Sequence, residues 1–145
     1  MSALFTSEID VRWSDLDALG HVNNATYATY VEEARLRWFQ TLDGAWKQGE
    51  AYPVVATQTV NYRRAVEWPA RLVLELQAQR VGSTSLSLGF RLLLEAELVA
   101  DGQTVLVWVD PNSGKPAPLP AALRAACERA MLGIDPATDP KSKQE

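Results

Sequence analysis

The sequence contains one cysteine and one histidine among its 145 residues. Cys127 alone cannot form an internal disulfide, so we expect a fold without disulfides in a reducing compartment. With only His21 beside it, most sets of metal ligands and most cysteine–histidine catalytic pairs are also excluded. We therefore predict no metal site.

Long apolar runs and an excess of positive charge are missing as well. No segment approaches the roughly 18 consecutive apolar residues of a membrane span, and no apolar run follows a basic start as in a secretory signal. The 14 Lys and Arg residues stand against 18 Asp and Glu, which gives a formal net charge of -4. A nucleic-acid-binding protein would show a basic face instead. We expect a soluble, cytoplasmic protein with no membrane span and no nucleic-acid partner.

The composition is that of an ordinary globular domain, with 47% hydrophobic and 22% charged residues. A chain of this length can bury a substantial core within one domain. We find no internal repeat and no low-complexity linker in the sequence. The pattern therefore predicts a single domain over residues 1–133, followed by a flexible tail over residues 134–145.

One amphipathic helix is predicted over residues 24–40, with Asn23 or Asn24 as its N-cap. Glu33 and Arg37 are placed to form a favourable i,i+4 pair on its exposed side. Apolar residues at spacings of three and four form one stripe along it: Tyr27, Tyr30, Val31, Ala34 and Trp38. This stripe is the side that we expect to pack against a sheet.

Alternating apolar and polar residues predict strands before and after this helix. In residues 54–62, Val54, Gln58 and Tyr62 are expected to share one face. Asp101-Gly102 is typical of a hairpin turn, and a short helix is expected over residues 121–131. The predicted strands cover residues 9–13, 54–62, 72–79, 85–94, 97–100 and 103–109. The order predicts an α+β fold, with one helix on an antiparallel sheet of about five strands.

Two carboxylates stand directly before the long helix. Asp15 and Asp17 are two residues apart, and Gly20, Asn23 and Asn24 follow before the helix begins. A carboxylate would then lie beside the unpaired N–H groups of a helix start, which can stabilise an oxyanion. Such an arrangement suits acyl transfer. From spacing alone, a carboxylate at this point more often caps the helix or belongs to the loop without a catalytic role.

Residues 12–24 read Arg-Trp-Ser-Asp-Leu-Asp-Ala-Leu-Gly-His-Val-Asn-Asn, and this string resembles the N-terminal signature of hotdog-fold acyl-CoA thioesterases. The family is the 4-hydroxybenzoyl-CoA thioesterase superfamily, in its long-chain acyl-CoA thioesterase branch. The likeness continues in Tyr27, Tyr30, Glu33, Ala34 and Arg35, in residues 61–65 and in residues 105–111. The N-terminal block is specific, whereas the strand region is less so.

The resemblance implies a hotdog thioesterase domain, in which a curved antiparallel sheet wraps one long central helix. It also implies a homodimer or homotetramer with active sites between subunits. The substrate would be an acyl-CoA, hydrolysed to free acid and CoA. No cofactor is implied, since coenzyme A is part of the substrate.

Asp17 matches the catalytic carboxylate of the family, as a general base or a nucleophile. The backbone N–H groups of Val22, Asn23 and Asn24 match the helix start that polarises the thioester carbonyl. We expect Asp15 to hydrogen-bond the loop backbone instead. Candidate substrate-binding residues are His21, Tyr27, Thr57, Thr59, Arg63, Arg64 and Arg80. Among them, the arginines would meet CoA phosphates, and the threonines would reach the partner's site.

Several alternatives stay open. Plant acyl-carrier-protein thioesterases have a similar block but carry Asn where this chain has Leu19, which counts against a carrier-protein substrate. A hotdog protein that binds acyl-CoA without hydrolysis is a second alternative, and a purely structural oligomer is a third. Trp46 and Trp68 fit either an acyl channel or a subunit contact. A serine hydrolase is excluded because the sequence has no Gly-x-Ser-x-Gly motif.

Overall fold

The computed structural model describes residues 3–42 and 47–134, which form one antiparallel sheet and two α-helices. A short 3₁₀ helix, Trp13–Asp15, follows the first strand. The elements are β1 (Phe5–Asp10), α1 (Thr26–Gln40), β2 (Tyr52–Tyr62), β3 (Arg71–Val81), β4 (Ser85–Leu94), β5 (Glu97–Val109) and α2 (Ala121–Met131). The α+β class and the position of α2 are as the sequence predicts.

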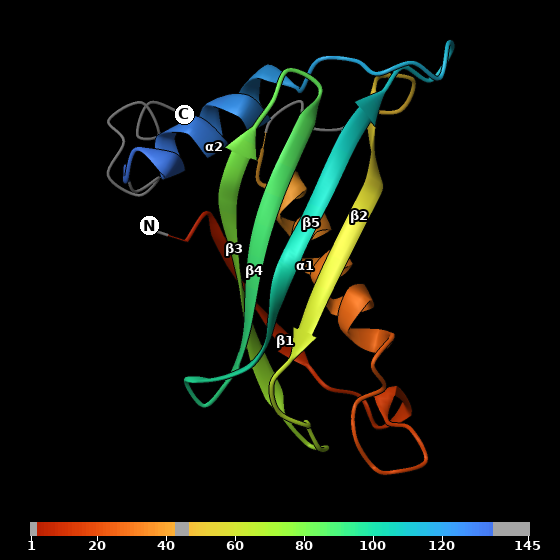
Figure 1. The fold of residues 1–145 in the computed structure, drawn as a ribbon, viewed down its shortest axis with the longest axis vertical. Coiled ribbons are helices and arrows are strands. Elements are labelled where there is room, and N and C mark those ends of the chain that lie inside the picture. The colour runs from red at the N-terminus through yellow and green to blue at the C-terminus, as the bar shows by residue number, and fades with distance from the viewer. Residues whose placement is uncertain (1–2, 43–46, 135–145) are drawn as a thin grey trace.

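The five strands lie in the order β1-β3-β4-β5-β2, and every neighbouring pair is antiparallel. The connections from β3 to β4 and from β4 to β5 are short. Tight turns of this kind can link antiparallel neighbours but not parallel ones. β1 and β2 form the two edges of the sheet. Figure 1 shows that the sheet is curved and that α1 lies across one of its faces.

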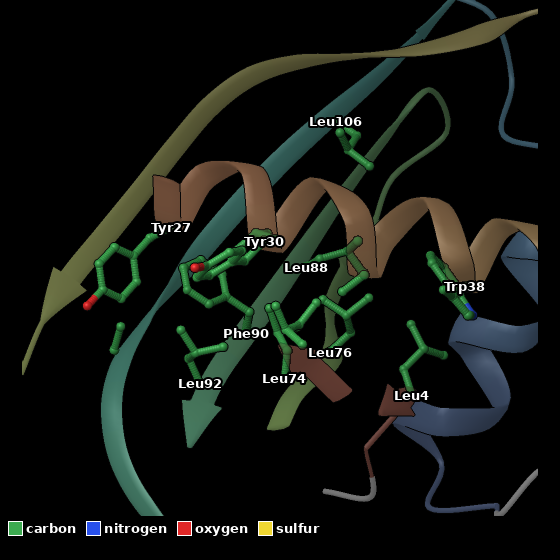
Figure 2. Close-up of a cluster of buried hydrophobic side chains, with 14 of the residues drawn as sticks. Leu4, Tyr27, Tyr30, Trp38, Leu74, Leu76, Leu88, Phe90, Leu92 and Leu106 are labelled. Carbon is green, nitrogen blue, oxygen red and sulfur yellow. The ribbon is translucent and has the colours of Figure 1, made fainter. Parts of the chain in front are cut away.

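The core lies between α1 and this face of the sheet, which we call the inner face. The whole predicted stripe of α1 is buried. Alternate residues of β3 and β4 meet it, because successive side chains of a strand point to opposite faces. In Figure 2, Tyr27 and Tyr30 project from α1 on the side of Phe90 and Leu92 of β4, and Trp38 lies at the other end of the cluster beside Leu4. Burial of these large side chains positions the start of α1 against the sheet.

Helix α1 differs from the expectation at its N-terminus and in its length. It begins at Thr26, and Ala25 occupies the N-cap position. The side chain of Asn23 still serves the helix start, since its Oδ1 accepts the N–H of Ala25 at 2.9 Å. With 15 residues, α1 is shorter than the long central helix that the resemblance implies.

The predicted turn at Asp101-Gly102 is wrong, because β5 runs through it without interruption. The chain reverses instead at Glu95 and Ala96, whose φ angles are 50° and 66°. Gly102 is needed for packing: a Cβ atom there would lie 1.9 Å from the Thr59 oxygen. Gly102 therefore allows β5 and β2 to approach closely, although the Asp-Gly sequence is also typical of a hairpin turn.

A β-bulge in β2 breaks the predicted alternation. Val55 pairs with Leu106, and Thr57 pairs with Val105, so Ala56 is the extra residue. A one-residue shift moves the following side chains to the opposite face. Val54 and Gln58, predicted to share a face, therefore point to opposite sides of the sheet.

The first strand also differs from its predicted range, since it covers Phe5–Asp10 and ends before Trp13. Of the predicted tail, only Ile134 belongs to the described residues, and positions 135–145 and Trp46 lie outside them. No helix in the described part of the chain is long and apolar enough to cross a membrane.

Candidate active site

A small backbone loop connects Asp15 to the start of α1. The N–H of Asp17 donates to the His21 oxygen at 2.8 Å, and the N–H of Asn23 donates to the Asp15 oxygen at 2.9 Å. Leu16 and Val22 form an isolated antiparallel bridge between these two contacts. The turn is closed at Gly20, where φ is 79°. Asp17 and the residues before α1 therefore lie on adjacent arms of one tight loop.

Asp17 is partly exposed, and among residues 3–42 and 47–134 only one of its carboxylate oxygens has hydrogen-bond donors. Oδ1 accepts the N–H of Leu19 at 2.9 Å and the N–H of His21 at 3.4 Å. Oδ2 accepts no hydrogen bond from the described residues. The two backbone donors orient the carboxylate and leave one oxygen able to meet water or substrate.

Asp15 is buried, with 4% of its surface exposed, and its carboxylate is fully engaged. Oδ2 accepts the Arg12 N–H at 2.9 Å and the Tyr30 hydroxyl at 2.7 Å, and Oδ1 accepts the Arg12 guanidinium at 2.9 Å. Burial acts to raise the pKa of Asp15, but these hydrogen bonds outweigh it and hold the pKa below its ordinary value. Burial, together with the Asp15 contact, raises the pKa of Tyr30. As predicted, Asp15 holds the loop.

The three predicted oxyanion donors are not equivalent. The Val22 N–H donates to the Val66 oxygen at 2.8 Å, and the Asn23 N–H donates to Asp15, so neither is free. The oxygen of Asn23 accepts the N–H of Thr26 at 2.9 Å. For the Asn24 N–H, the described residues provide no acceptor. Asn24 is therefore the one member of the predicted set with an available donor.

His21 lies opposite Asp17 in the loop. Its Nε2 is 3.9 Å from Glu67 Oε1, and 41% of its side chain is exposed. Since Val22 also contacts Val66, the segment that contains Val66 and Glu67 runs beside the loop that carries Asp17. The backbone of His21 therefore contacts that of Asp17, whereas its ring lies toward Glu67.

Tyr27 lies in the first turn of α1, between two other tyrosine rings. It is buried, and its ring centroid is 6.2 Å from that of Tyr30 and 5.2 Å from that of Tyr62. Burial raises the pKa of Tyr27. The Tyr62 hydroxyl donates to the Asn24 oxygen at 2.9 Å, which joins the end of β2 to the helix start. No local pattern indicates this contact, because its partners are 38 positions apart.

Thr57 and Thr59 lie on the outer face of the sheet, away from α1. Thr57 pairs with Val105 and Thr59 with Gln103, and both partners point outward. Thr59 lines an outer hollow of about 330 Å³ together with Gln79 and Gln103. Within one chain, the structure does not bring either threonine to Asp17.

The three candidate arginines are divided between the two ends of the sheet. Arg63 pairs with Asp101 at 3.1 Å, and Arg64 pairs with Glu97. Both follow Tyr62, at the end of β2 near the start of α1. Arg80 lies at the end of β3, at the opposite end of the sheet (Figure 1). The structure therefore groups Arg63 and Arg64 with the Asp17 end and separates Arg80 from it.

An apolar cavity of about 680 Å³ lies beside the C-terminal half of α1. Leu36 and Phe39 of α1 and Tyr52 and Pro53 of β2 line it. Trp68, at 49% exposure, belongs to the loop next to His21 and does not line this cavity. Within residues 3–42 and 47–134, no group of three or more His, Cys, Asp or Glu side chains is placed to hold a metal ion.

Comparisons place the chain beside known proteins. A model of the Thioesterase-like superfamily matches residues 11–127. The long-chain acyl-CoA thioesterase FadM of Escherichia coli (strain K12) is 32% identical over 129 residues, which cover 86% of this chain and 98% of FadM.

Two solved structures are similar in both sequence and fold. A thioesterase from Thermus thermophilus, complexed with coenzyme A and Zn, is 36% identical, with a TM-score of 0.77 over 92% of this chain and 97% of that one. A protein from Pseudomonas aeruginosa is 40% identical, with a TM-score of 0.81 over 86% of this chain and 98% of its own.

Proposed function

The chain belongs to the thioesterase-like superfamily, and we propose that it hydrolyses acyl-CoA thioesters to free acid and CoA. Thioester hydrolysis is the activity of its named relatives, and one solved relative holds coenzyme A. One observation carries the proposal within this chain. Within residues 3–42 and 47–134, Asp17 has one carboxylate oxygen without a hydrogen-bond donor, and it stands in the loop that ends at Asn24, whose N–H has no acceptor there.

In this proposal the Asn24 N–H polarises the thioester carbonyl. It stands just before α1, where the partial positive charge of the helix adds to the stabilisation of an oxyanion. Asp17 uses its free oxygen in one of two ways. It takes a proton from the attacking water, or it attacks the carbonyl itself and forms an anhydride that water then opens. The thiolate of CoA is the leaving group on either route.

The acyl group and the CoA portion need separate places. The apolar cavity beside Leu36 and Phe39 supports a site for the acyl group farther along α1. Arg63 and Arg64 support a contact with CoA phosphates, for which they would exchange their carboxylate partners. We assign His21 and Tyr27 to the walls of the reaction site.

We also propose that the active protein is a homo-oligomer, in which the edge strand β2 meets a second copy. The strand exposes large apolar side chains along its length, among them Val54 at 44% and Val55 at 46%. An open apolar edge is suited to pairing with another strand. Such pairing would bring Thr57 and Thr59 close to the partner.

Free-thiol release from a panel of acyl-CoAs, from acetyl through aryl to palmitoyl, tests the proposed activity. We expect saturable turnover on at least one member, and the best substrate would define the acyl class. Matched carrier-protein thioesters should be hydrolysed more slowly. Saturable acyl-CoA binding without turnover on either series would replace hydrolysis by a binding function.

A further inference from the structure

The peptide group that carries the Asn24 N–H lies between two anchored neighbours. On one side, Tyr30 donates to the Asp15 carboxylate at 2.7 Å, and the backbone oxygen of Asp15 accepts the Asn23 N–H at 2.9 Å. On the other side, Tyr62 donates to the Asn24 oxygen at 2.9 Å. Two tyrosine hydroxyls from different elements thus restrain the chain immediately before and after this N–H.

We propose that Tyr30 and Tyr62 are positioning residues that together fix the direction of the Asn24 N–H. The inference rests on the proposed function, in which this N–H polarises the thioester carbonyl. Tyr30 acts through Asp15 and Asn23, whereas Tyr62 acts directly on the Asn24 carbonyl. In this role neither hydroxyl contacts the substrate.

The direction of this donor needs restraint because Asn24 lies outside the regular helix. α1 begins at Thr26, and at the entrance to the helix the peptide group between Asn23 and Asn24 is held through its oxygen, which accepts the Thr26 N–H at 2.9 Å, while the two tyrosine hydroxyls restrain the residues on either side of it. A hydrogen bond weakens steeply when its angle falls below about 120°. An oxyanion donor is effective when it is oriented before the reaction, so the restraint should influence turnover more than binding.

The two tyrosines differ in burial, and this difference separates function from stability. Tyr30 is 3% exposed, so loss of its hydroxyl would leave the buried Asp15 carboxylate with one donor fewer. Tyr62 is 49% exposed and its ring packs edge-on against Tyr27. A phenylalanine at position 62 would keep the ring contact and lose the hydroxyl alone. Tyr62→Phe is therefore the sharper probe.

Kinetics on the best acyl-CoA substrate test the positioning role. Tyr30→Phe and Tyr62→Phe are each expected to lower kcat about three- to tenfold. KM should stay within about twofold of the wild-type value, since ground-state binding is retained. The Tm of Tyr62→Phe should equal that of the wild type. Thr6→Val is the control for loss of one exposed hydroxyl, because Thr6 lies on β1, away from the proposed site, and its hydroxyl has no partner among the described residues. A kcat for Tyr62→Phe equal to that of Thr6→Val would overturn the proposal.

A second measurement separates this inference from the proposed function. The ¹⁵N heteronuclear NOE of the Asn24 amide, recorded without substrate, should match helix values in the wild type and fall in both variants. If the NOE falls in a protein without turnover, the proposed function is rejected while the restraint by the tyrosines stands. If a protein that hydrolyses acyl-CoA keeps both its NOE and its kcat in the variants, the positioning role alone is rejected.

Discussion

At the residue scale, Asp15 and Asp17 differ in how much of each carboxylate the protein occupies. Asp15 accepts hydrogen bonds on both oxygens from Arg12 and Tyr30, whereas Asp17 accepts them from the described part of the chain on Oδ1 only. Hydrogen bonds to a buried charged group contribute more than those at the surface. The sequence places both acids two residues apart, and the fold gives them separate tasks.

Replacing Asp15 should therefore reduce stability. Asp15→Asn is expected to lower the free energy of unfolding by about 2 kcal/mol, because the Arg12 and Tyr30 contacts lose their charged acceptor. Asp17→Asn keeps an acceptor for Leu19 and should cost less than about 1 kcal/mol. Urea unfolding followed by circular dichroism measures both. Equal losses for the two variants would contradict the assignment.

The lowered pKa of Asp15 predicts a specific acid dependence. Because the folded protein holds this proton less readily than the unfolded chain, the contribution to stability is present above about pH 4. It is lost as the pH falls through the folded-state pKa. Between about pH 4 and pH 2, the unfolding free energy of Asp15→Asn should thus fall less steeply than that of the wild type. Identical slopes would show that the contacts of Asp15 do not favour its charged form.

At the element scale, the turn between β4 and β5 carries strain that can be removed. Glu95 and Ala96 both have positive φ angles, which favour Gly and Asn. Ala96→Gly is expected to stabilise the protein by about 0.5 kcal/mol, and thermal unfolding would show the increase. The same exchange in α2, Ala125→Gly, should destabilise by about 1 kcal/mol. A lower Tm for Ala96→Gly would contradict this account of the turn.

The elements that the sequence predicts well are those whose signal is local. Tyr27, Val31 and Trp38 repeat at the helical period, and each is buried as expected. Gly102 is predicted wrongly because the reason for a glycine there is not local. It is the close approach of the Thr59 backbone on the neighbouring strand. The bulge at Ala56 likewise depends on pairing with β5, which alternation within β2 does not reveal.

The candidate site likewise combines features with a local sequence signal and features that depend on long-range contacts. The signature around Asp17 lies within one stretch of chain, so sequence alone indicates it. The occupation of the Val22 N–H by Val66 and the contact of Tyr62 with Asn24 depend on the folded loop and on β2. The Val66 contact occupies the Val22 N–H, and Asp15 occupies the Asn23 N–H within the loop, so Asn24 remains of the three predicted donors. The contact with β2 adds a tyrosine that no spacing indicates.

At the scale of the whole molecule, the proposed homo-oligomer would form through the open edge at β2. We expect Val55→Lys, which places a charge on the exposed edge, to shift the protein from an oligomer to a monomer. Leu132→Lys, at a position that is 77% exposed outside the sheet, should leave the assembly unchanged. Light scattering coupled to gel filtration measures the mass of each. An unchanged mass for Val55→Lys would place the subunit contact elsewhere.

Thiol release by Asp17→Asn, measured beside the wild type, tests most directly whether Asp17 performs thioester hydrolysis. On the best acyl-CoA substrate, we expect kcat to fall by about 10²–10⁴-fold, while the circular dichroism spectrum and oligomeric mass stay unchanged. The asparagine keeps the contact with the Leu19 N–H but can neither accept the proton nor attack the thioester. Near-wild-type turnover by a folded Asp17→Asn protein would contradict the account.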